Sequence, residues 1–230
     1  MTELKDGERL DDLGNGMRII QSRDKFAFST DAVALAEFVN LYKGDRVLDL
    51  GAGTGSVSLL MVGRKSLASV TGLELQPELV DMAQRSAAVN GLSHVHFQEG
   101  DLRQVREIFP PGCFDVVVSN PPYQPAGGLL QNQRTAFALA RHELACTLED
   151  IVSACAWLVR FRGKVALVHR PERLVDILSL MRKAQLEPKR LQFISPKPGV
   201  APVIVLVEAQ KGASPGLLVL APKILGGDSS

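Results

Sequence analysis

Long apolar runs, paired cysteines and a large excess of charge of either sign are all missing from this 230-residue chain. No apolar stretch reaches the roughly 20 residues that a membrane-spanning helix needs, and the N-terminus has no apolar signal-peptide core. The three cysteines, Cys113, Cys146 and Cys155, match neither a C-x-x-C pair nor a zinc site, so no metal is implied. They are expected to be reduced core residues of a cytoplasmic protein that needs no membrane.

The net charge is +1, but the charged residues are unevenly distributed along the chain. Residues 151–211 carry 11 Lys/Arg against 4 Asp/Glu, a balance of +7, whereas residues 1–50 have a balance of −3. A basic C-terminal half is compatible with a polyanion partner such as nucleic acid. Solvated helix faces would produce the same imbalance, and charge alone does not separate the two interpretations.

Apolar segments that alternate between strand-like and helix-like patterns predict an α/β fold in one domain over residues 1–230. Strands are expected at 46–50, 69–74, 95–99, 114–119, 163–169, 191–194 and 203–207. Helices are expected at 31–40, 56–61, 76–90, 148–158 and 171–184. The prediction is a Rossmann-like, seven-stranded, mostly parallel sheet with one antiparallel strand and helices on both faces. Three appendages complete it: a hairpin extension in 1–30, an insertion at 124–147 with helical composition from 134 to 144, and a flexible tail at 212–230.

A glycine loop follows the first core strand and opens a helix, the geometry that brings backbone N–H groups close to a ligand. The loop has the form Asp49-x-Gly51-x-Gly53-x-Gly55, with Ser56 where a dinucleotide site would carry its third glycine. A P-loop is excluded because G-x-x-x-x-G-K-[ST] is absent. The pattern resembles the S-adenosylmethionine (SAM) loop of Rossmann-like methyltransferases. Asp49 could hold this loop or meet the ammonium group of the ligand.

Two further carboxylates end the next two strands on the same sheet edge, where ligands of such folds bind. Glu74, followed by Leu75, is placed to accept both ribose hydroxyls. Asp101, followed by Leu102, is placed to accept from the adenine amino group. Either acid alone would be read as a helix cap or a solvated charge, but the ordered set favours a nucleoside-containing ligand.

A stiff corner, Asn120-Pro121-Pro122-Tyr123, leaves the fourth strand. Its prolines fix φ and remove two backbone donors. The Asn120 side-chain oxygen and the Pro121 carbonyl can accept both hydrogens of one amino group, and the Tyr123 ring can stack on the plane behind it. Amino-methyltransferases that act on adenine or on a glutamine amide carry the same corner.

Four segments together resemble the bacterial tRNA1(Val) (adenine-N6)-methyltransferases, class I SAM-dependent enzymes that modify valine tRNA beside the anticodon. They are Phe28-Ser29-Thr30-Asp31, the loop 49–55, the corner 120–123 and Ala140-Arg141-His142-Glu143. The resemblance implies that Phe28 and Thr30 close over the methionine end of SAM. It also implies that Arg134, Arg141 and His142 lie near the target base or the tRNA backbone, although each could equally be a solvated helix charge or a cap.

The expected activity is direct transfer of the SAM methyl group to an adenine N6 in RNA, with tRNA as the partner. The alternatives are a protein glutamine methyltransferase, a DNA adenine methyltransferase and a SAM-binding module without catalysis. The particular tRNA and the oligomeric state stay open.

Overall fold

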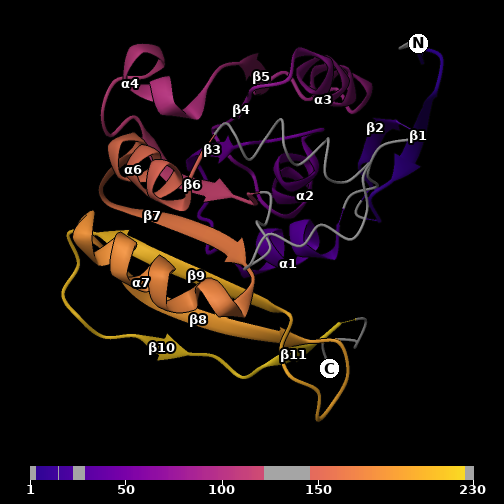
Figure 1. Cartoon of the computed structure of the whole chain (residues 1–230). Coiled ribbons are helices and arrows are strands. Elements are labelled where there is room, and N and C mark those ends of the chain that lie inside the picture. Colours follow the sequence, from indigo (N-terminus) through magenta and orange to yellow (C-terminus); the bar gives the residue numbers. More distant parts are fainter. Residues whose placement is uncertain (1–3, 15, 23–28, 122–145, 226–230) are drawn as a thin grey trace.

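The core of the structure is a mixed sheet with helices on both faces (Figure 1). The computed structural model describes residues 4–14, 16–22, 29–121 and 146–225. The main strands are β3 (Arg46–Leu50), β4 (Ser69–Glu74), β5 (Val95–Glu99), β6 (Phe114–Ser119), β7 (Val159–His169), β8 (Leu186–Ser195) and β9 (Ile204–Lys211). They lie in the order β8-β9-β7-β6-β3-β4-β5, and β9 alone among these seven runs against its neighbours. The predicted seven strands, mostly parallel with one antiparallel, are therefore confirmed as the main part of a nine-stranded sheet.

Helices cover the two faces of the sheet because successive strand residues point to opposite sides. The helices are α1 (Thr30–Phe38), α2 (Ser56–Arg64), α3 (Pro77–Val89), α4 (Val105–Ile108), α6 (Leu148–Leu158) and α7 (Leu174–Lys183), with short 3₁₀ turns η1 (Leu102–Gln104) and η2 (Pro171–Arg173). Val116 and Val118 of β6 pack with the helices α1 to α3, whereas Val117 packs with α6 and α7. This alternation produces two buried clusters and confirms helices on both faces.

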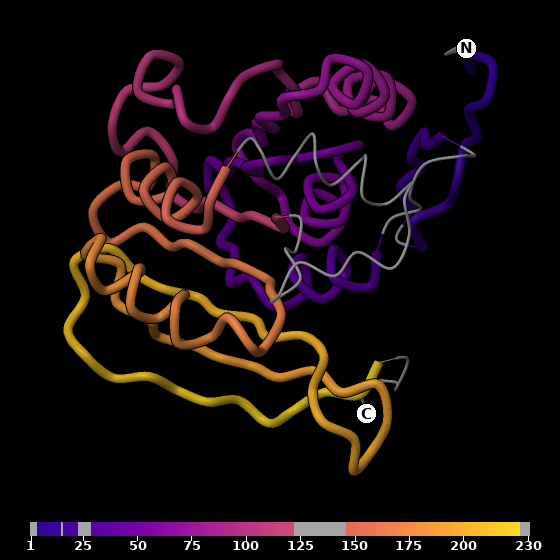
Figure 2. The backbone as a smooth tube through the Cα atoms, viewed as in Figure 1, coloured from indigo at the N-terminus to yellow at the C-terminus, as the bar shows by residue number. Residues whose placement is uncertain are grey.

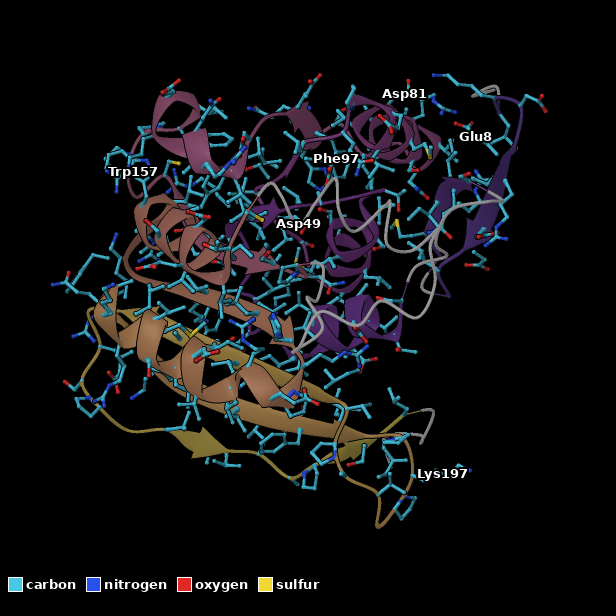
Figure 3. All side chains as sticks on the ribbon, viewed as in Figure 1. Glu8, Asp49, Asp81, Phe97, Trp157 and Lys197 are labelled. Atoms are coloured by element: carbon cyan, nitrogen blue, oxygen red, sulfur yellow. The ribbon has the colours of Figure 1, made fainter. Side chains whose placement is uncertain are left out.

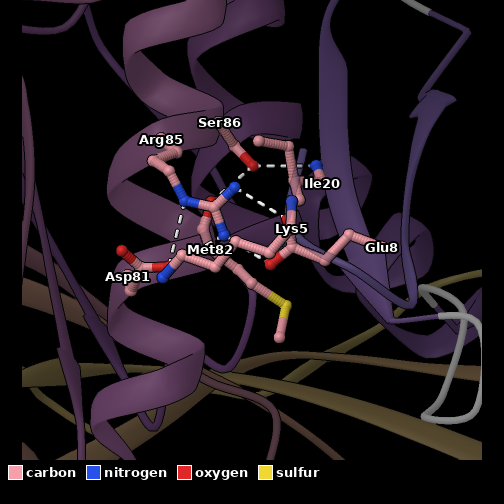
Figure 4. Close-up of polar contacts among 7 residues, drawn as sticks. All are labelled: Lys5, Glu8, Ile20, Asp81, Met82, Arg85 and Ser86. Carbon is pink, nitrogen blue, oxygen red and sulfur yellow. Dashed lines mark hydrogen bonds and ion pairs between the residues drawn. The ribbon is translucent and has the colours of Figure 1, made fainter. Parts of the chain in front are cut away.

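A two-stranded hairpin, β1 (Glu8–Asp12) and β2 (Arg18–Ser22), packs on α3. The Ser86 hydroxyl accepts from the Ile20 backbone N–H at 2.9 Å (Figure 4). The Arg85 guanidinium donates to both Glu8 and Asp81, and its hydrogen bond to Glu8 holds the pKa of that carboxyl below its usual value. The N-terminal hairpin expected from the sequence is thus present, and side chains of Ser86, Arg85 and Asn90 tie it to the domain.

The C-terminal segment differs from the flexible tail expected from residue 212. Residues 212–225 run beside β8 and add two short strands, β10 (Leu218–Val219) and β11 (Lys223–Ile224), both parallel to it (Figure 2). The Gln192 side chain donates to the Ala221 carbonyl at 2.9 Å, and Leu220 and Leu225 pack partly into the core. The segment lacks helical or strand periodicity, but the open edge of β8 supplies hydrogen-bond partners that order it.

Two strands begin earlier than expected. β7 begins at Val159, directly after α6, instead of at residue 163, and β8 begins at Leu186 instead of at residue 191. Pro188 was an obstacle to predicting the second strand, because proline removes a ladder donor. The pairing of β8 with β9 shifts register between Pro188 and Arg190, which accommodates it.

Candidate functional site

The glycine loop connects β3 to α2 at the carboxyl edge of the sheet. Gly51, Gly53 and Gly55 adopt φ values of +77°, +56° and +84°, which side-chain-bearing residues rarely adopt. A Cβ added at Gly51 or Gly53 would meet no atom within 4 Å, whereas one at Gly55 would strike the Phe97 ring at 2.6 Å. The first two glycines therefore leave open space above the loop, and the third is required for packing.

Glu74 at the end of β4 holds this loop in place. Its carboxylate is buried and accepts from the Gly53 N–H at 2.9 Å and from the Gln76 N–H at 3.0 Å. The carboxylate thus joins the glycine loop to the beginning of α3, a role that sequence reasoning did not assign. Glu74 also lines the cleft described below, so its remaining lone pairs can meet a ligand hydroxyl.

Asp49, on β3 just before the loop, is 1% exposed and lies in the interior of the protein (Figure 3). Its Oδ2 accepts from the Ser58 backbone N–H at 3.1 Å and from the Ser58 hydroxyl at 2.7 Å. Its Oδ1 has no hydrogen-bond partner among the described residues. Burial raises the pKa of Asp49 to about 6, with a smaller contribution from the nearby Glu74 charge, while the Ser58 bonds lower it. A buried acceptor without a donor is costly, so Asp49 is suited to a cationic donor.

Asp101 follows β5 and caps η1. It is tied to Arg103: the Arg103 backbone N–H donates to Oδ1 at 2.9 Å, and the guanidinium contacts both carboxylate oxygens. These hydrogen bonds lower the pKa of Asp101 and keep it ionised. An incoming amino group would have to share this carboxylate with Arg103.

A cleft with about 490 Å³ of empty space, partly open to solvent, brings these strand ends together. The lining residues are Leu50, Gly51, Leu73, Glu74, Leu75, Gly100, Asp101, Leu102, Ser119, Pro121, Cys146 and Ile151. The Ser119 hydroxyl donates to the Leu50 carbonyl at 2.7 Å and locks the end of β6 to the end of β3. Asn120 lies between two cleft residues, Ser119 and Pro121.

The structure brings most of the predicted cofactor-site residues to this cleft. Gly51, Glu74, Leu75, Asp101 and Leu102 line it; Gly53 and Gly55 lie in its loop, and Asp49 lies just before that loop. Thr30 is the exposed first residue of α1 and is not among the lining residues. Predictions for Phe28, Pro122, Tyr123, Arg134, Arg141 and His142 fall outside the described residues.

Cys146 is a cleft residue that the sequence interpretation missed by treating it as core. It is half-buried, just before Thr147, which caps α6 in a capping box with Asp150. Burial, and then the charges of Asp150 and Asp101, raise the pKa of the Cys146 thiol. The only sequence signal was its position before the capped helix.

Comparison with known proteins identifies a family and several relatives. A family model described as a methyltransferase domain matches residues 41–184, more than half of the chain. A tRNA1(Val) (adenine(37)-N6)-methyltransferase of Porphyromonas gingivalis is 30% identical over 70% of this chain, but the chain covers only 64% of that relative's length. The enzyme of the same name from Parabacteroides distasonis is 29% identical, over 78% of this chain and 74% of that protein.

The solved structures include one with the same architecture over most of its length. A predicted O-methyltransferase from Agrobacterium tumefaciens has a TM-score of 0.69 and 26% identity, over 87% of this chain and 90% of that one. Across the part of the chain that the structure describes, no helix is long and apolar enough to cross a membrane. The same residues contain no cluster of three or more His, Cys, Asp or Glu that could hold a metal ion.

Proposed function

Because the chain belongs to the methyltransferase-domain family, we propose that it transfers a methyl group from SAM to the exocyclic N6 of an adenine in tRNA. Two curated relatives bear the name of that activity, and the cleft lies at the carboxyl edge of the sheet. The acceptor is proposed to lie near the anticodon, because RNA bases are accessible in unpaired loops. No membrane or metal enters the proposal.

The cleft and the residues around its glycine loop fit the donor. The Asp49 Oδ1 lacks a partner among the described residues, as a receptor for an ammonium group should before its ligand binds. Open space above Gly51 and Gly53 admits the amino-acid portion of the ligand close to the backbone. Glu74 faces the same cleft and can accept from ribose hydroxyls, and Asp101 can accept from the adenine amino group. When bound, SAM supplies a methyl group already activated by its sulfonium.

The acceptor side is assigned to Asn120 and Pro121. Their oxygens accept the two amino hydrogens and turn the nitrogen lone pair out of the base plane, towards the methyl carbon. As the new C–N bond forms, the C–S bond breaks, and the extra proton on nitrogen leaves to water. Position and orientation supply the rate in such a step, so no dedicated base is needed. The target base must first leave its stack, which costs a few kcal/mol.

One observation carries the proposal: Asn120 is flanked by Ser119 and Pro121, two residues of the same cleft wall that contains Glu74 and Asp101. We expect Asn120→Ala to lower kcat by ~100- to 1,000-fold, the loss typical of removing one polar group from a transition state. Binding of SAM, measured by titration calorimetry, should stay within twofold of wild type. Unchanged turnover in this variant would refute the role of Asn120.

The acceptor class is tested with methyl-labelled SAM and separate pools of tRNA, rRNA, DNA and peptide-chain release factor. We expect label in tRNA, recovered as N6-methyladenosine after digestion to nucleosides. Label in the release factor or in DNA instead would assign the same site to a glutamine amide or to DNA adenine. Tight SAM binding with no methyl transfer to any pool would show that the protein binds SAM without catalysing transfer to these acceptors.

A further inference from the structure

The amino ends of the strands form a surface opposite the cleft, and this surface carries exposed aromatic rings beside cations. Phe161 is 66% exposed and Tyr42 is 58% exposed. The Arg162 guanidinium lies 5.5 Å from the centre of the Phe161 ring, and the Lys164 ammonium lies 3.9 Å from that of Tyr42. We name the set the basic aromatic pole: Tyr42, Arg46, Arg160, Phe161, Arg162 and Lys164.

The backbone of β7 is irregular at this pole. Arg162 has φ +63°, one of two positive-φ residues other than glycine among the described residues. The pairing of β6 with β7 shifts register between Phe114 and Val116, and a Cβ on Gly163 would lie 2.7 Å from the Asp115 carbonyl. Bulges of this kind re-aim side chains, and a left-handed arginine is strained by ~1–2 kcal/mol. Gln210 donates to the Arg162 carbonyl at 2.9 Å and holds this shape.

The Phe161 ring packs against the backbone of Gly212 and lies near the Arg162 guanidinium, yet the residue is largely exposed. Gly212, at φ +66°, lies against the ring so closely that a Cβ there would overlap it. The ring therefore rests on a glycine backbone while most of its surface faces solvent. The exposed ring offers a flat surface, and every nucleobase has a face that can stack on such a surface.

The charges around the two rings have one predominant sign. Arg46 and Arg160 share a single carboxylate, Asp115, with contacts of 3.2 Å and 2.5 Å. The other two cations of the pole lie over the aromatic rings and make no ion pair with a described residue. The pole thus accounts for part of the excess positive charge of residues 151–211. Cations interleaved with aromatic rings are the arrangement that binds single-stranded nucleic acid, because phosphates meet the cations and bases stack on the rings.

We propose that the basic aromatic pole is a second contact surface for the RNA substrate, where phosphates meet the cations and an unpaired base stacks on Phe161. The proposal rests on the proposed function, because it assumes an RNA substrate. Leu167 of β7 lies opposite the cleft residue Ser119, so Phe161 is six residues, ~20 Å along the strand, from the cleft end of the sheet, and farther over the protein surface. An RNA that places its target base in the cleft can reach the pole only with a segment far from that base. Full-length tRNA should therefore use the pole, and an isolated anticodon stem-loop should not.

The test compares full-length tRNA with the stem-loop by fluorescence anisotropy. Phe161→Ala should weaken full-length tRNA binding by roughly tenfold, the effect expected for one stacked base, and leave stem-loop binding unchanged. Arg162→Gln should reduce the slope of log K against log salt by about 0.7–0.9 for each phosphate that the variant no longer neutralises. With full-length tRNA, KM should rise while kcat stays constant, because the cleft is untouched.

Matched variants control for general effects. Leu218→Ala removes an apolar side chain that is 58% exposed on β10, and Lys5→Gln removes a cation paired with Asp81 near the N-terminal hairpin; neither should change tRNA affinity. Arg162→Gly removes the cation while relieving the left-handed strain, and an unchanged unfolding midpoint would show that its effect on tRNA binding does not come from misfolding.

Equal affinity of Phe161→Ala and wild type for full-length tRNA would overturn the inference. A sedimentation coefficient of Phe161→Ala that differs from that of wild type in the absence of RNA would also overturn it, because the pole would then be an interface between protein molecules. If wild type methylates tRNA and Phe161→Ala does so with the same KM, only this inference fails. If wild type neither binds nor methylates RNA, the proposed function fails with it.

Discussion

At the scale of single residues, the buried carboxylate of Asp49 is suited to binding a cationic group but lowers the stability of the folded protein. Its pKa of about 6 in the native protein exceeds the ordinary value of 3.8 because burial disfavours the charged form. Between about pH 4 and 6 the native state therefore holds a proton that the unfolded chain has released. The contribution of Asp49 to stability falls as pH rises through that window and is least favourable above pH 6.

We expect Asp49→Asn to raise the free energy of unfolding at pH 7 by up to ~3 kcal/mol, because it removes a buried charge. The gain should disappear near pH 4, where the native carboxyl is already protonated. Urea unfolding at both pH values measures the difference, and titration with SAM should show binding at least tenfold weaker. A variant less stable than wild type at pH 7 would contradict this account of the buried carboxyl.

Element packing explains which glycines of the sheet edge serve the fold. Gly72 on β4 and Gly55 at the beginning of α2 both face the Phe97 ring of β5, and a Cβ at either position would overlap or crowd that ring. Gly72 has no positive φ, so its requirement is purely one of space. Phe97 thus sets the distance between three elements that shape the cleft.

We expect Gly72→Ala to destabilise the protein by about 1–3 kcal/mol through overpacking, and Phe97→Leu in the same chain to recover part of that stability. Gly44→Ala is the matched control, since its added Cβ meets nothing within 4 Å and only its φ of +85° is strained. Chemical unfolding of the single and double variants gives the coupling energy. Strict additivity of Gly72→Ala and Phe97→Leu would show that the two side chains do not meet.

The elements also show how far sequence reasoning reaches. Strands such as β3 and β6 were predictable because β-branched runs bounded by turns are local signals. The glycine loop and its carboxylates were predictable because their order along the chain maps onto parallel strand ends. The start of β7 at Val159 was not, because it abuts α6 without a turn signal. Cys146 was missed as a cleft residue because only tertiary packing carries it there.

At the scale of the whole molecule, residues 212–225 close one margin of the sheet. They cover the edge of β8 with β10 and β11, and the Leu220 and Leu225 backbone N–H groups bond to β8 carbonyls at 2.8 and 2.9 Å. Sequence reasoning treated this segment as a tail because its order comes from the strand it pairs with and not from its own periodicity.

We expect truncation after Lys211 to lower the free energy of unfolding by about 2–4 kcal/mol, since it removes two partly buried leucines. The exposed β8 edge should also increase aggregation. Thermal unfolding and light scattering at several protein concentrations test both effects, and truncation after Leu225 serves as the control. A truncated protein as stable and monodisperse as the control would show that the segment contributes nothing to the sheet.

The position of Cys146 makes the reactivity of its thiol a measure of whether the cleft is occupied. Its thiol forms part of the wall and stays protonated because its pKa is raised, so it is a slow nucleophile. A small alkylating reagent would modify it gradually in the empty protein and more slowly still when a ligand fills the space beside it. The rate of that single modification, followed by mass spectrometry, would therefore measure how often the cleft is filled, without any label on the ligand.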